Sequence, residues 1–172
     1  MRPPGTEAVA KKGAGGGTPA AQALDRAGVV HTLRPYDHDP RAESYGLEAA
    51  EVLGVDPARV LKTLLAEADG RLVVAVVPVA GRLDLKALAR AVGARKAVMA
   101  DPSVAERATG YVVGGISPLG QRRAHPTVVD TSALDHETVL VSAGRRGLDV
   151  ELAPGDLVEL TSATTAPIAT QG

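Results

Sequence analysis

The sequence contains no cysteine among its 172 residues. This absence excludes disulfide bonds, thiolate zinc sites, iron–sulfur clusters and a cysteine nucleophile supplied by the protein itself. A chain without cysteine is compatible with any compartment, and it fits the cytoplasm, where thiols stay reduced. The apolar stretch of a signal peptide is also missing from the first residues, so we expect a cytoplasmic protein.

Aromatic residues are almost absent as well. The chain has three tyrosines, Tyr36, Tyr45 and Tyr111, and no tryptophan or phenylalanine. The core must therefore be aliphatic. A platform of several rings on which nucleic-acid bases could stack is excluded.

No charge of one sign dominates, and no long apolar run is present. The 19 Lys and Arg residues nearly balance the 20 Asp and Glu residues, so any contact with nucleic acid must come from a local basic patch. Charged residues interrupt every apolar stretch before it reaches the ~18 residues of a membrane span. We therefore expect neither a membrane nor DNA as a partner. The 45% of hydrophobic residues is typical of an ordinary globular domain.

The chain divides into one domain between two short tails. Residues 1–17 are rich in Gly, Ala and Pro and show no periodicity, which predicts a flexible N-terminal tail. Residues 18–164 form the folded domain. We expect the chain to fray from residue 162, and residues 165–172 to form a C-terminal tail.

Capping residues and glycines mark the predicted helices. N-cap signals followed by closing glycines predict four helices, within residues 18–28, 44–54, 84–93 and 101–110. A fifth helix is expected over residues 154–160. In the second helix the spacing of apolar residues predicts burial of Leu47, Ala50, Val52 and Leu53.

Short apolar runs predict strands, at residues 30–36, 60–66, 72–77, 111–113, 127–130, 139–142 and 148–152. The dipeptide Asp69-Gly70 between the second and third runs is typical of a hairpin, with a loop of two residues or more. Strands outnumber helices, and the helices are interspersed irregularly. The fold class is therefore mixed α/β, of the α+β type with a mixed sheet, and not a regular parallel βαβ array.

Lys62 is the first candidate functional residue. If residues 60–65 form a strand, Lys62 shares its face with Val60 and Leu64. An ammonium group on an apolar face is costly unless it meets an anion or opens onto a cleft. The alternative is a lysine on an edge strand whose side chain reaches solvent.

Gly114 and Gly115 form the second candidate, in a glycine-rich segment over residues 111–120. Adjacent glycines at a strand end let the backbone approach a ligand and direct N–H groups toward it, although a bare Gly-Gly also forms ordinary tight turns. Ser117 in the same segment resembles a nucleophile elbow with the wrong spacing. The residue after it is Pro118, which has no N–H for an oxyanion, so we reject that interpretation.

The four histidines, His31, His38, His125 and His136, show no spacing typical of a helical metal site. The polar segment over residues 36–40 leaves a metal site open beside the simpler interpretation of a solvated turn. Nothing specific indicates a Ser-His-Asp triad. We predict no metal and no cofactor.

Basic residues occur as two pairs in predicted loops: Arg122 with Arg123, and Arg145 with Arg146. Charge pairs in loops are usually solvated surface. These two pairs lie beside glycine-rich turns, and this position indicates a rim that contacts phosphates.

Several segments together carry a resemblance to a known family. They are Thr18-Pro-Ala20, Tyr36-Asp-His-Asp-Pro40, Lys62-Thr-Leu-Leu65, Leu83-Asp-Leu-Lys86, Met99-Ala-Asp-Pro102, the stretch over residues 109–120 with its Gly-Gly-Ile-Ser-Pro-Leu-Gly block, and Arg146-Gly-Leu-Asp149. The chain resembles the YbaK family, the freestanding Cys-tRNA(Pro) deacylases related to the editing domain of bacterial prolyl-tRNA synthetases. The resemblance covers residues 18–160.

This resemblance implies a compact curved sheet or barrel of six or seven strands with flanking helices. It also implies an activity, the removal of cysteine mischarged on tRNA(Pro), in which the substrate's own thiol attacks its ester carbonyl. Lys62 matches the key pocket lysine of the family, and Tyr36, Gly114, Ser142 and Asp149 match other pocket positions. We expect Gly115 to contact substrate beside Gly114.

The expected partner is the acceptor end of tRNA(Pro) carrying cysteine, with prolyl-tRNA synthetase as a transient partner. Two alternatives stay open at this point. One is a deacylase of another small amino acid, alanine or serine on tRNA(Pro), that uses activated water. The other is a non-catalytic module that binds a tRNA end or a synthetase.

Overall fold

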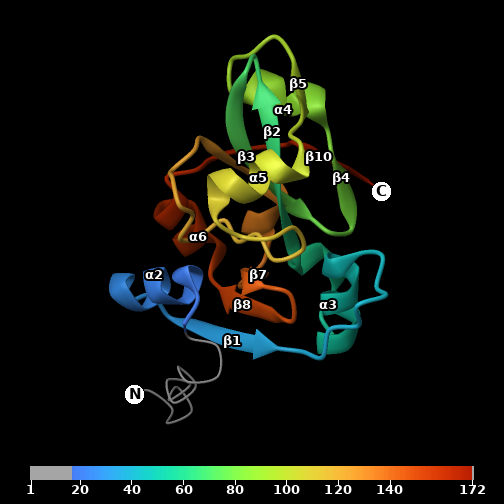
Figure 1. The fold of residues 1–172 in the computed structure, drawn as a ribbon, viewed down its shortest axis with the longest axis vertical. Coiled ribbons are helices and arrows are strands. Elements are labelled where there is room, and N and C mark those ends of the chain that lie inside the picture. The colour runs from blue at the N-terminus through green and yellow to red at the C-terminus, as the bar shows by residue number, and fades with distance from the viewer. Residues whose placement is uncertain (1–16, 172) are drawn as a thin grey trace.

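The computed structural model describes residues 17–171 (Figure 1). The predicted N-terminal tail, except for Gly17, lies outside the described residues. Five helices are found in the described part of the chain, at α2 (Pro19–Ala27), α3 (Tyr45–Leu53), α4 (Leu85–Ala91), α5 (Pro102–Thr109) and α6 (Pro154–Thr161).

The strands form three sheets. The largest has the order β5-β2-β3-β6-β9, from β5 (Ala97–Met99), β2 (Leu61–Ala68), β3 (Arg71–Pro78), β6 (Thr127–Asp130) and β9 (Thr164–Ala166). The second, here called the small sheet, has the order β1-β8-β7, from β1 (His31–Pro35), β8 (Leu148–Leu152) and β7 (Val139–Arg145). A third pairs β4 (Gly81–Leu83) with β10 (Ala169–Gln171). Parallel and antiparallel pairs both occur, which confirms the mixed α/β class, but the sheets remain open and do not close into a barrel.

Local signals fix the helix ends as predicted. The Thr18 side chain accepts a hydrogen bond from Ala21 N, and Ser44 accepts one from Leu47 N. Gly28 and Gly54 close the same two helices in the left-handed region, at φ +66° and +68°, where glycine carries no steric penalty. The helix predicted from residue 101 is α5, although Asp101 makes no capping hydrogen bond with its side chain.

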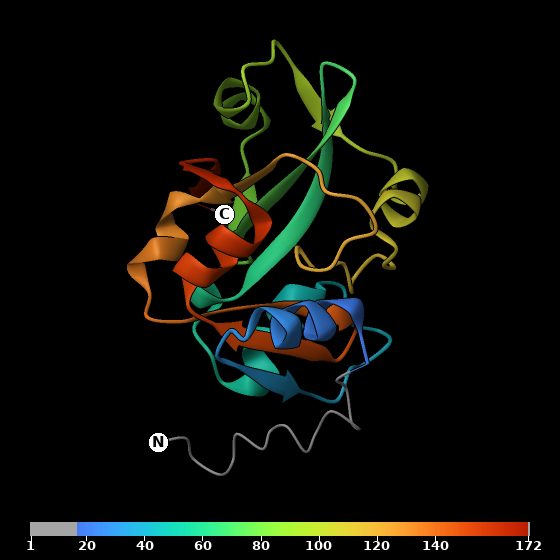
Figure 2. The same ribbon diagram turned by 90° about the vertical axis from the view of Figure 1, so that its left-hand side faces the viewer.

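The β2–β3 hairpin has the minimal loop. Ala68 pairs with Arg71, so Asp69 and Gly70 alone make the turn, with φ of 51° and 86°. Positive φ at both central residues is the signature of a type I′ turn, whose twist matches that of the two strands. The resulting long, curved hairpin runs from the small sheet to the far end of the molecule (Figures 1 and 2).

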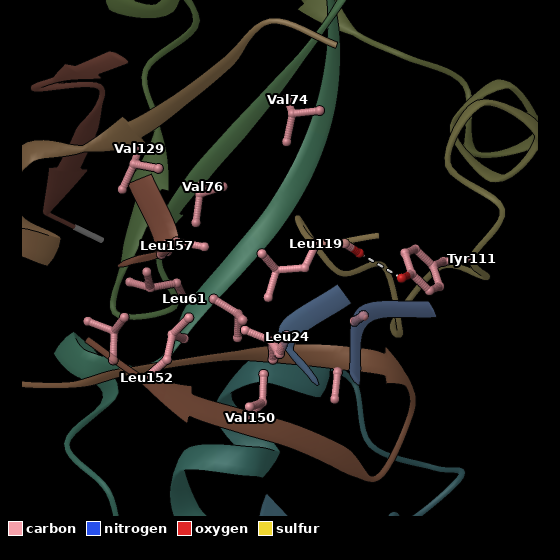
Figure 3. Close-up of a cluster of buried hydrophobic side chains, with 14 of the residues drawn as sticks. Leu24, Leu61, Val74, Val76, Tyr111, Leu119, Val129, Val150, Leu152 and Leu157 are labelled. Carbon is pink, nitrogen blue, oxygen red and sulfur yellow. Dashed lines mark hydrogen bonds between the residues drawn. The ribbon is translucent and has the colours of Figure 1, made fainter. Parts of the chain in front are cut away.

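The main core lies between the β2–β3 hairpin and the β1-β8-β7 sheet (Figure 3). Leu24 from α2, Leu61 from β2 and Val150 from β8 are buried in this cluster. The opposite face of β7 carries Leu140, which packs with Ala50 of α3. The small sheet therefore lies between α2 and α3.

Three expectations about elements are wrong. Residues 111–113 form part of a loop, because the Tyr111 hydroxyl donates to Leu119 O at 2.7 Å and anchors the segment by its side chain (Figure 3). Leu47 and Val52 on α3 are 46% and 53% exposed, since the short helix buries Ala49 and Ala50 and packs Leu53 against the same cluster.

The expected frayed end is replaced by strands β9 and β10. Asp130 accepts hydrogen bonds from Ile168 N at 2.8 Å and Ala169 N at 3.0 Å, and Ile168 is fully buried. The buried Ile168 side chain and the Asp130 carboxylate thus hold this segment in place, although its sequence shows no periodic pattern of apolar residues. None of the helices within residues 17–171 has the length and apolar character required to cross a bilayer.

Candidate functional site

A cavity of about 380 Å³ opens between the β2 edge and the small sheet. Its apolar side includes Leu65 of β2, Ala105 of α5 and Ile116 of the glycine-rich loop. Its polar side includes Tyr36 and Asp149. A largely pre-formed cavity with a few converging polar groups is the usual form of a small-ligand site.

Five of the predicted site residues line this one cavity, although they lie far apart in the sequence. They are Tyr36, Lys62, Gly114, Ser142 and Asp149. Gly115 is not among the residues that line the cavity. It packs against the backbone of Arg145, which a Cβ placed on Gly115 would meet at 2.8 Å. Its N–H is already bonded to Val112 O at 2.8 Å, so in this turn Gly114 is the glycine beside the cavity.

Asp149 and Glu151 stand two residues apart on β8 in contrasting environments. Burial raises the Asp149 pKa to about 7, against the lowering effect of the Arg34 charge. Burial also acts to raise the Glu151 pKa, but hydrogen bonds from Thr138 and Arg34 and the charges of Arg34 and Arg59 lower it overall. Arg34 forms its ion pair with Glu151, and Asp149 is mostly in the neutral, protonated form below about pH 7.

Cross-strand pairing places the polar groups of the small sheet in a row. Arg34 lies opposite Asp149, and Asp149 lies opposite Ser142. Burial is the main cause that raises the Tyr36 pKa to about 12, and the nearby Asp149 carboxylate adds to it. The Ser142 hydroxyl accepts from Gly144 N at 3.1 Å, which leaves its proton available to a ligand.

Lys62 is half-buried and lines the cavity on the face of β2 that also carries Leu64. Burial lowers its pKa, and the Arg82 charge lowers it further. Neither an ion pair nor a hydrogen bond to its ammonium group is found within residues 17–171. A cation that is desolvated and unpaired beside a cavity favours an anionic or strongly dipolar ligand.

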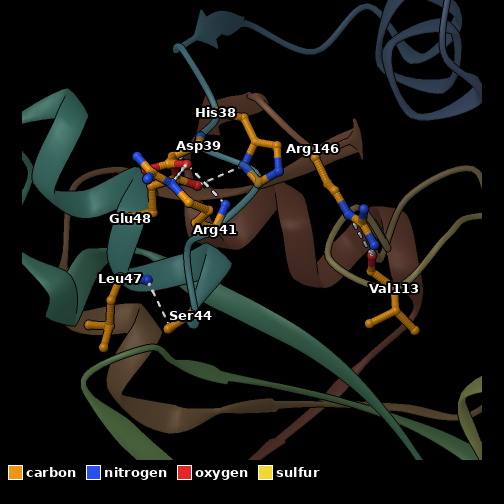
Figure 4. A network of polar contacts seen from close by, with 8 residues as sticks. All are labelled: His38, Asp39, Arg41, Ser44, Leu47, Glu48, Val113 and Arg146. Atoms are coloured by element: carbon orange, nitrogen blue, oxygen red, sulfur yellow. Dashed lines mark hydrogen bonds and ion pairs between the residues drawn. The ribbon is translucent and has the colours of Figure 1, made fainter.

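Gly114 lies beside Tyr45 and Arg146, and Figure 4 shows the contact that Arg146 makes with the neighbouring Val113. Arg146, in the turn after β7, donates from Nε and Nη2 to Val113 O at 2.9 and 2.6 Å. Its guanidinium lies 4.9 Å from the centre of the Tyr45 ring, and Tyr45 lines the cavity. A Cβ on Gly114 would approach both the Tyr45 ring and Arg146 Nε to 2.8 Å, so only glycine fits there.

The polar segment before α3 is held by one carboxylate. Glu48 Oε1 lies 2.9 Å from His38 Nδ1, and Glu48 Oε2 accepts from Asp39 N at 2.6 Å (Figure 4). These contacts fix the loop that leads from Tyr36 into the cavity wall. In the described part of the chain no group of three His, Cys, Asp or Glu side chains is arranged to hold a metal.

The four predicted phosphate contacts lie outside the cavity lining, and all four side chains are exposed. Arg145 and Arg146 flank the glycine-rich turn, as the Gly115 contact with Arg145 shows. Arg146 has a structural contact of its own with Val113. Arg122 donates to Arg107 O at the end of α5.

The hydroxyl groups of Ser44 and Ser117 are used in local structure. Ser44 caps α3, and Ser117 is fully buried with its hydroxyl accepting from Leu119 N at 3.1 Å. None of the residues that line the cavity is a histidine. Within residues 17–171, the arrangement of a hydroxyl activated by an imidazole is therefore not found at this cavity.

Sequence reasoning missed Tyr45, Thr63 and the α5 side of the cavity with Pro102. Tyr45 is one of three aromatic residues in the chain, and this rarity was the available signal. Thr63 carried no signal beyond its position after Lys62. The α5 contribution depends on long-range packing that periodicity does not encode.

Comparison with known proteins identifies the family of the chain. Residues 39–160 match the family model described as an aminoacyl-tRNA editing domain. Over 123 residues the chain is 41% identical to the Enterococcus faecalis protein EbsC, which is named as a candidate Cys-tRNA(Pro)/Cys-tRNA(Cys) deacylase. This match covers 71% of this chain and 75% of that protein. A shorter match, 40% identical, covers 42% of this chain and 13% of the proline–tRNA ligase of Moorella thermoacetica.

A solved structure described as a candidate trans-editing enzyme for prolyl tRNA synthetase has the same fold. Its TM-score is 0.77 at 23% identity, and the match covers 99% of each chain. At 23% identity this structural match shows only that the fold is shared. The match to the family model and the identity with the Enterococcus protein are similarities of sequence. The chain therefore belongs to the aminoacyl-tRNA editing domain family, in agreement with its resemblance to the YbaK family.

Proposed function

We propose that this chain is a trans-editing deacylase that removes cysteine mischarged on tRNA(Pro), with the cysteine thiol of the substrate as the nucleophile. The observation that best supports this function is the cavity itself. It gathers Lys62, Ser142 and Asp149 around a space large enough for an aminoacyl ester, and its lining offers no activated nucleophile. The Enterococcus relative carries a name with the same substrate class.

In the proposed step the substrate sulfur attacks the carbonyl carbon of its own ester. A carbon–sulfur bond forms, and the bond from that carbon to the ribose oxygen breaks. The thiol proton ends on the ribose oxygen, so the products are a cyclic thiolactone and tRNA with a free terminal hydroxyl. The protein contributes by holding the thiol against the carbonyl, and such positioning is worth ~7–11 kcal/mol in the best intramolecular cases.

Each lining residue has a role that its environment supports. The half-buried Lys62 ammonium anchors the negatively charged terminus of the tRNA or polarises the ester. The Gly114 N–H faces the aminoacyl carbonyl, because the Gly115 N–H is already used in the turn. Ser142 and Asp149 orient the amino group and the terminal adenosine, and Tyr36 closes that end of the cavity.

The arginines at the rim extend the site toward the tRNA backbone. Arg122, Arg123, Arg145 and Arg146 are exposed, and phosphate contacts of this kind position a nucleic acid without reading its sequence. A transient complex with prolyl-tRNA synthetase would supply the mischarged tRNA. The expected location is the cytoplasm, where that tRNA is made.

A second candidate activity is favoured by the burial of Asp149 in the cavity lining, which raises the pKa of this carboxyl group to about 7. A buried carboxyl group with a pKa near neutrality is suited to act as a general base on water. Such an enzyme would hydrolyse alanine or serine esters of tRNA(Pro) as readily as cysteine esters. A non-catalytic module that binds tRNA ends is the third possibility.

One assay separates the three. Cys-, Ala- and Ser-tRNA(Pro) are incubated with the protein, together with Cys-tRNA(Pro) whose thiol has been alkylated. We expect rapid loss of cysteine only, and no loss once the thiol is blocked. Cleavage of the alkylated or alanyl substrate would favour water activation, and binding without any cleavage would identify a non-catalytic module.

A further inference from the structure

The wall of the cavity includes a stretch of β2 that has an open edge. On this side β5 pairs with β2 only from Ala66 to Ala68, and Ala100 N adds one bond to Leu65 O at 3.0 Å. At the other end β7 reaches β2 through a single bridge at Val60. Neither neighbour pairs with Thr63, which lines the cavity between these two points.

The register shows which backbone groups face this open edge. Val79 N donates to Val60 O at 2.8 Å, so residue 60 is a hydrogen-bonded partner of β3. Hydrogen-bonded and non-hydrogen-bonded pairs alternate in an antiparallel ladder. Residues 61, 63, 65 and 67 therefore direct their N–H and C=O groups away from β3. The bond from Ala100 N to Leu65 O agrees with this phase.

Thr63 is thus left with unpaired backbone groups beside the cavity. Within residues 17–171 no loop or helix supplies a hydrogen bond to its N–H or C=O. Its side-chain hydroxyl is also buried and has no partner. A buried polar group without a partner costs the fold roughly 1–3 kcal/mol, so the buried Thr63 hydroxyl, together with the two unpaired backbone groups of the same residue, points to a ligand that completes them.

We propose that the aminoacyl group of the substrate binds Thr63 as a one-residue strand added to β2. An aminoacyl ester contains the nitrogen, α-carbon and carbonyl of a strand residue in the same order. In a hydrogen-bonded antiparallel pair, two residues exchange both of their N–H···O bonds. The substrate ammonium donates to Thr63 C=O, and the Thr63 N–H donates to the ester carbonyl. The Thr63 hydroxyl is a further acceptor for the ammonium group.

This pairing rests on the proposed function and makes it more specific. The carbonyl that the thiol attacks would receive the Thr63 N–H in addition to the Gly114 N–H. Two fixed N–H donors on one reacting carbonyl form an oxyanion hole, and removal of one such donor typically slows a reaction about 10²- to 10³-fold. The pairing also selects α-amino acids, because it requires both the amino group and the carbonyl.

The test replaces one backbone N–H by oxygen. The α-hydroxy acid analogue of threonine is introduced at position 63, and the analogue of glutamate at position 67 is the matched control. Glu67 lies on the same edge, but β5 covers it, since Glu67 pairs with Val98. We expect the change at 63 to lower kcat/KM about a hundredfold. The change at 67 should lower the melting temperature and leave the activity of the folded protein unchanged.

The amino group is tested with a substrate that lacks it. tRNA(Pro) charged with 3-mercaptopropionate keeps the thiol and the ester carbonyl. Thr63→Val should lower kcat/KM about tenfold on Cys-tRNA(Pro) and have no effect on the deaminated substrate, and Thr63→Ser should restore most of the activity. The valine variant should also melt at a higher temperature, because an unpaired buried hydroxyl is gone.

The two hypotheses fail in different ways. If the unmodified protein does not release cysteine, the proposed function is wrong. If it releases cysteine and the backbone change at position 63 leaves kcat/KM at its original value, the strand pairing is wrong. An equal loss from Thr63→Val on both substrates would likewise overturn the contact with the ammonium group.

Discussion

Gly114→Ala tests whether the glycine-rich turn shapes the cavity or merely connects two elements. Gly114 has φ +91°, a conformation that costs an L-residue roughly 1–2 kcal/mol. A new Cβ would in addition meet the Tyr45 ring and Arg146 Nε at 2.8 Å, which forces both side chains to move. Overpacking of this kind typically costs about 1–3 kcal/mol more.

Gly54→Ala is the matched control. Gly54 also has a left-handed φ, +68°, but a Cβ there would meet no atom within 4 Å. The difference between the two variants therefore isolates the contact with Tyr45 and Arg146. We expect Gly114→Ala to lose roughly 1–3 kcal/mol more free energy of unfolding in urea than Gly54→Ala does.

Deacylation gives the second readout for this pair. A displacement of Tyr45 moves the cavity wall, and misplacement by about 1 Å can reduce a rate about a hundredfold. Gly54→Ala should keep the original kcat/KM in the folded protein. Equal stability losses in the two variants, or full activity of folded Gly114→Ala, would refute the argument that this turn defines the site.

Three further predictions follow from the charges around the cavity. Lys62→Met should abolish deacylation, while the free energy of unfolding stays equal or rises. Burial lowers the Lys62 pKa, so the folded protein disfavours the cation that the variant removes. A loss of stability with normal activity per folded molecule would show a structural role instead. The free energy of unfolding should fall as pH rises from about 4 to about 7, since folded Asp149 retains a proton that the unfolded chain has released. Asp149→Asn should flatten this slope, which is at most ~1.4 kcal/mol per pH unit. An identical pH profile in the variant would contradict the raised Asp149 pKa. Arg122→Ala combined with Arg123→Ala should weaken binding of all tRNAs about equally and reduce the salt slope, whereas an unchanged slope would remove both arginines from the interface.

Elements with strong local signals could be predicted from the sequence. The caps at Thr18 and Ser44 and the turn at Asp69-Gly70 are each set by a few adjacent residues. The end of the chain could not be predicted, because strands β9 and β10 depend on Asp130 and on burial of Ile168. Such long-range contacts leave no periodic pattern in a segment of small residues.

The candidate site divides in the same way. Lys62 could be found because a charge on an apolar strand is unusual, and Gly114 because paired glycines permit special turns. The resemblance added Tyr36, Ser142 and Asp149, which the fold brings to the same cavity. Thr63 could not be found, since its proposed role depends on backbone groups that are left open where β5 and β7 stop.

The two carboxylates of β8 explain how one strand serves both the fold and the site. Glu151 binds Arg34 and Arg59, and these ion pairs favour its charged form on the central strand of the sheet. Burial raises the Asp149 pKa to about 7, although the Arg34 charge acts against this rise, so Asp149 is mostly neutral below that pH. A neutral Asp149 would not oppose the negative charge that develops on sulfur and then on the carbonyl oxygen in the proposed thiol attack. The same charge would be favoured by the half-buried Lys62 ammonium, which also lines the cavity. The distribution of charge around this cavity thus suits a substrate that brings its own thiol.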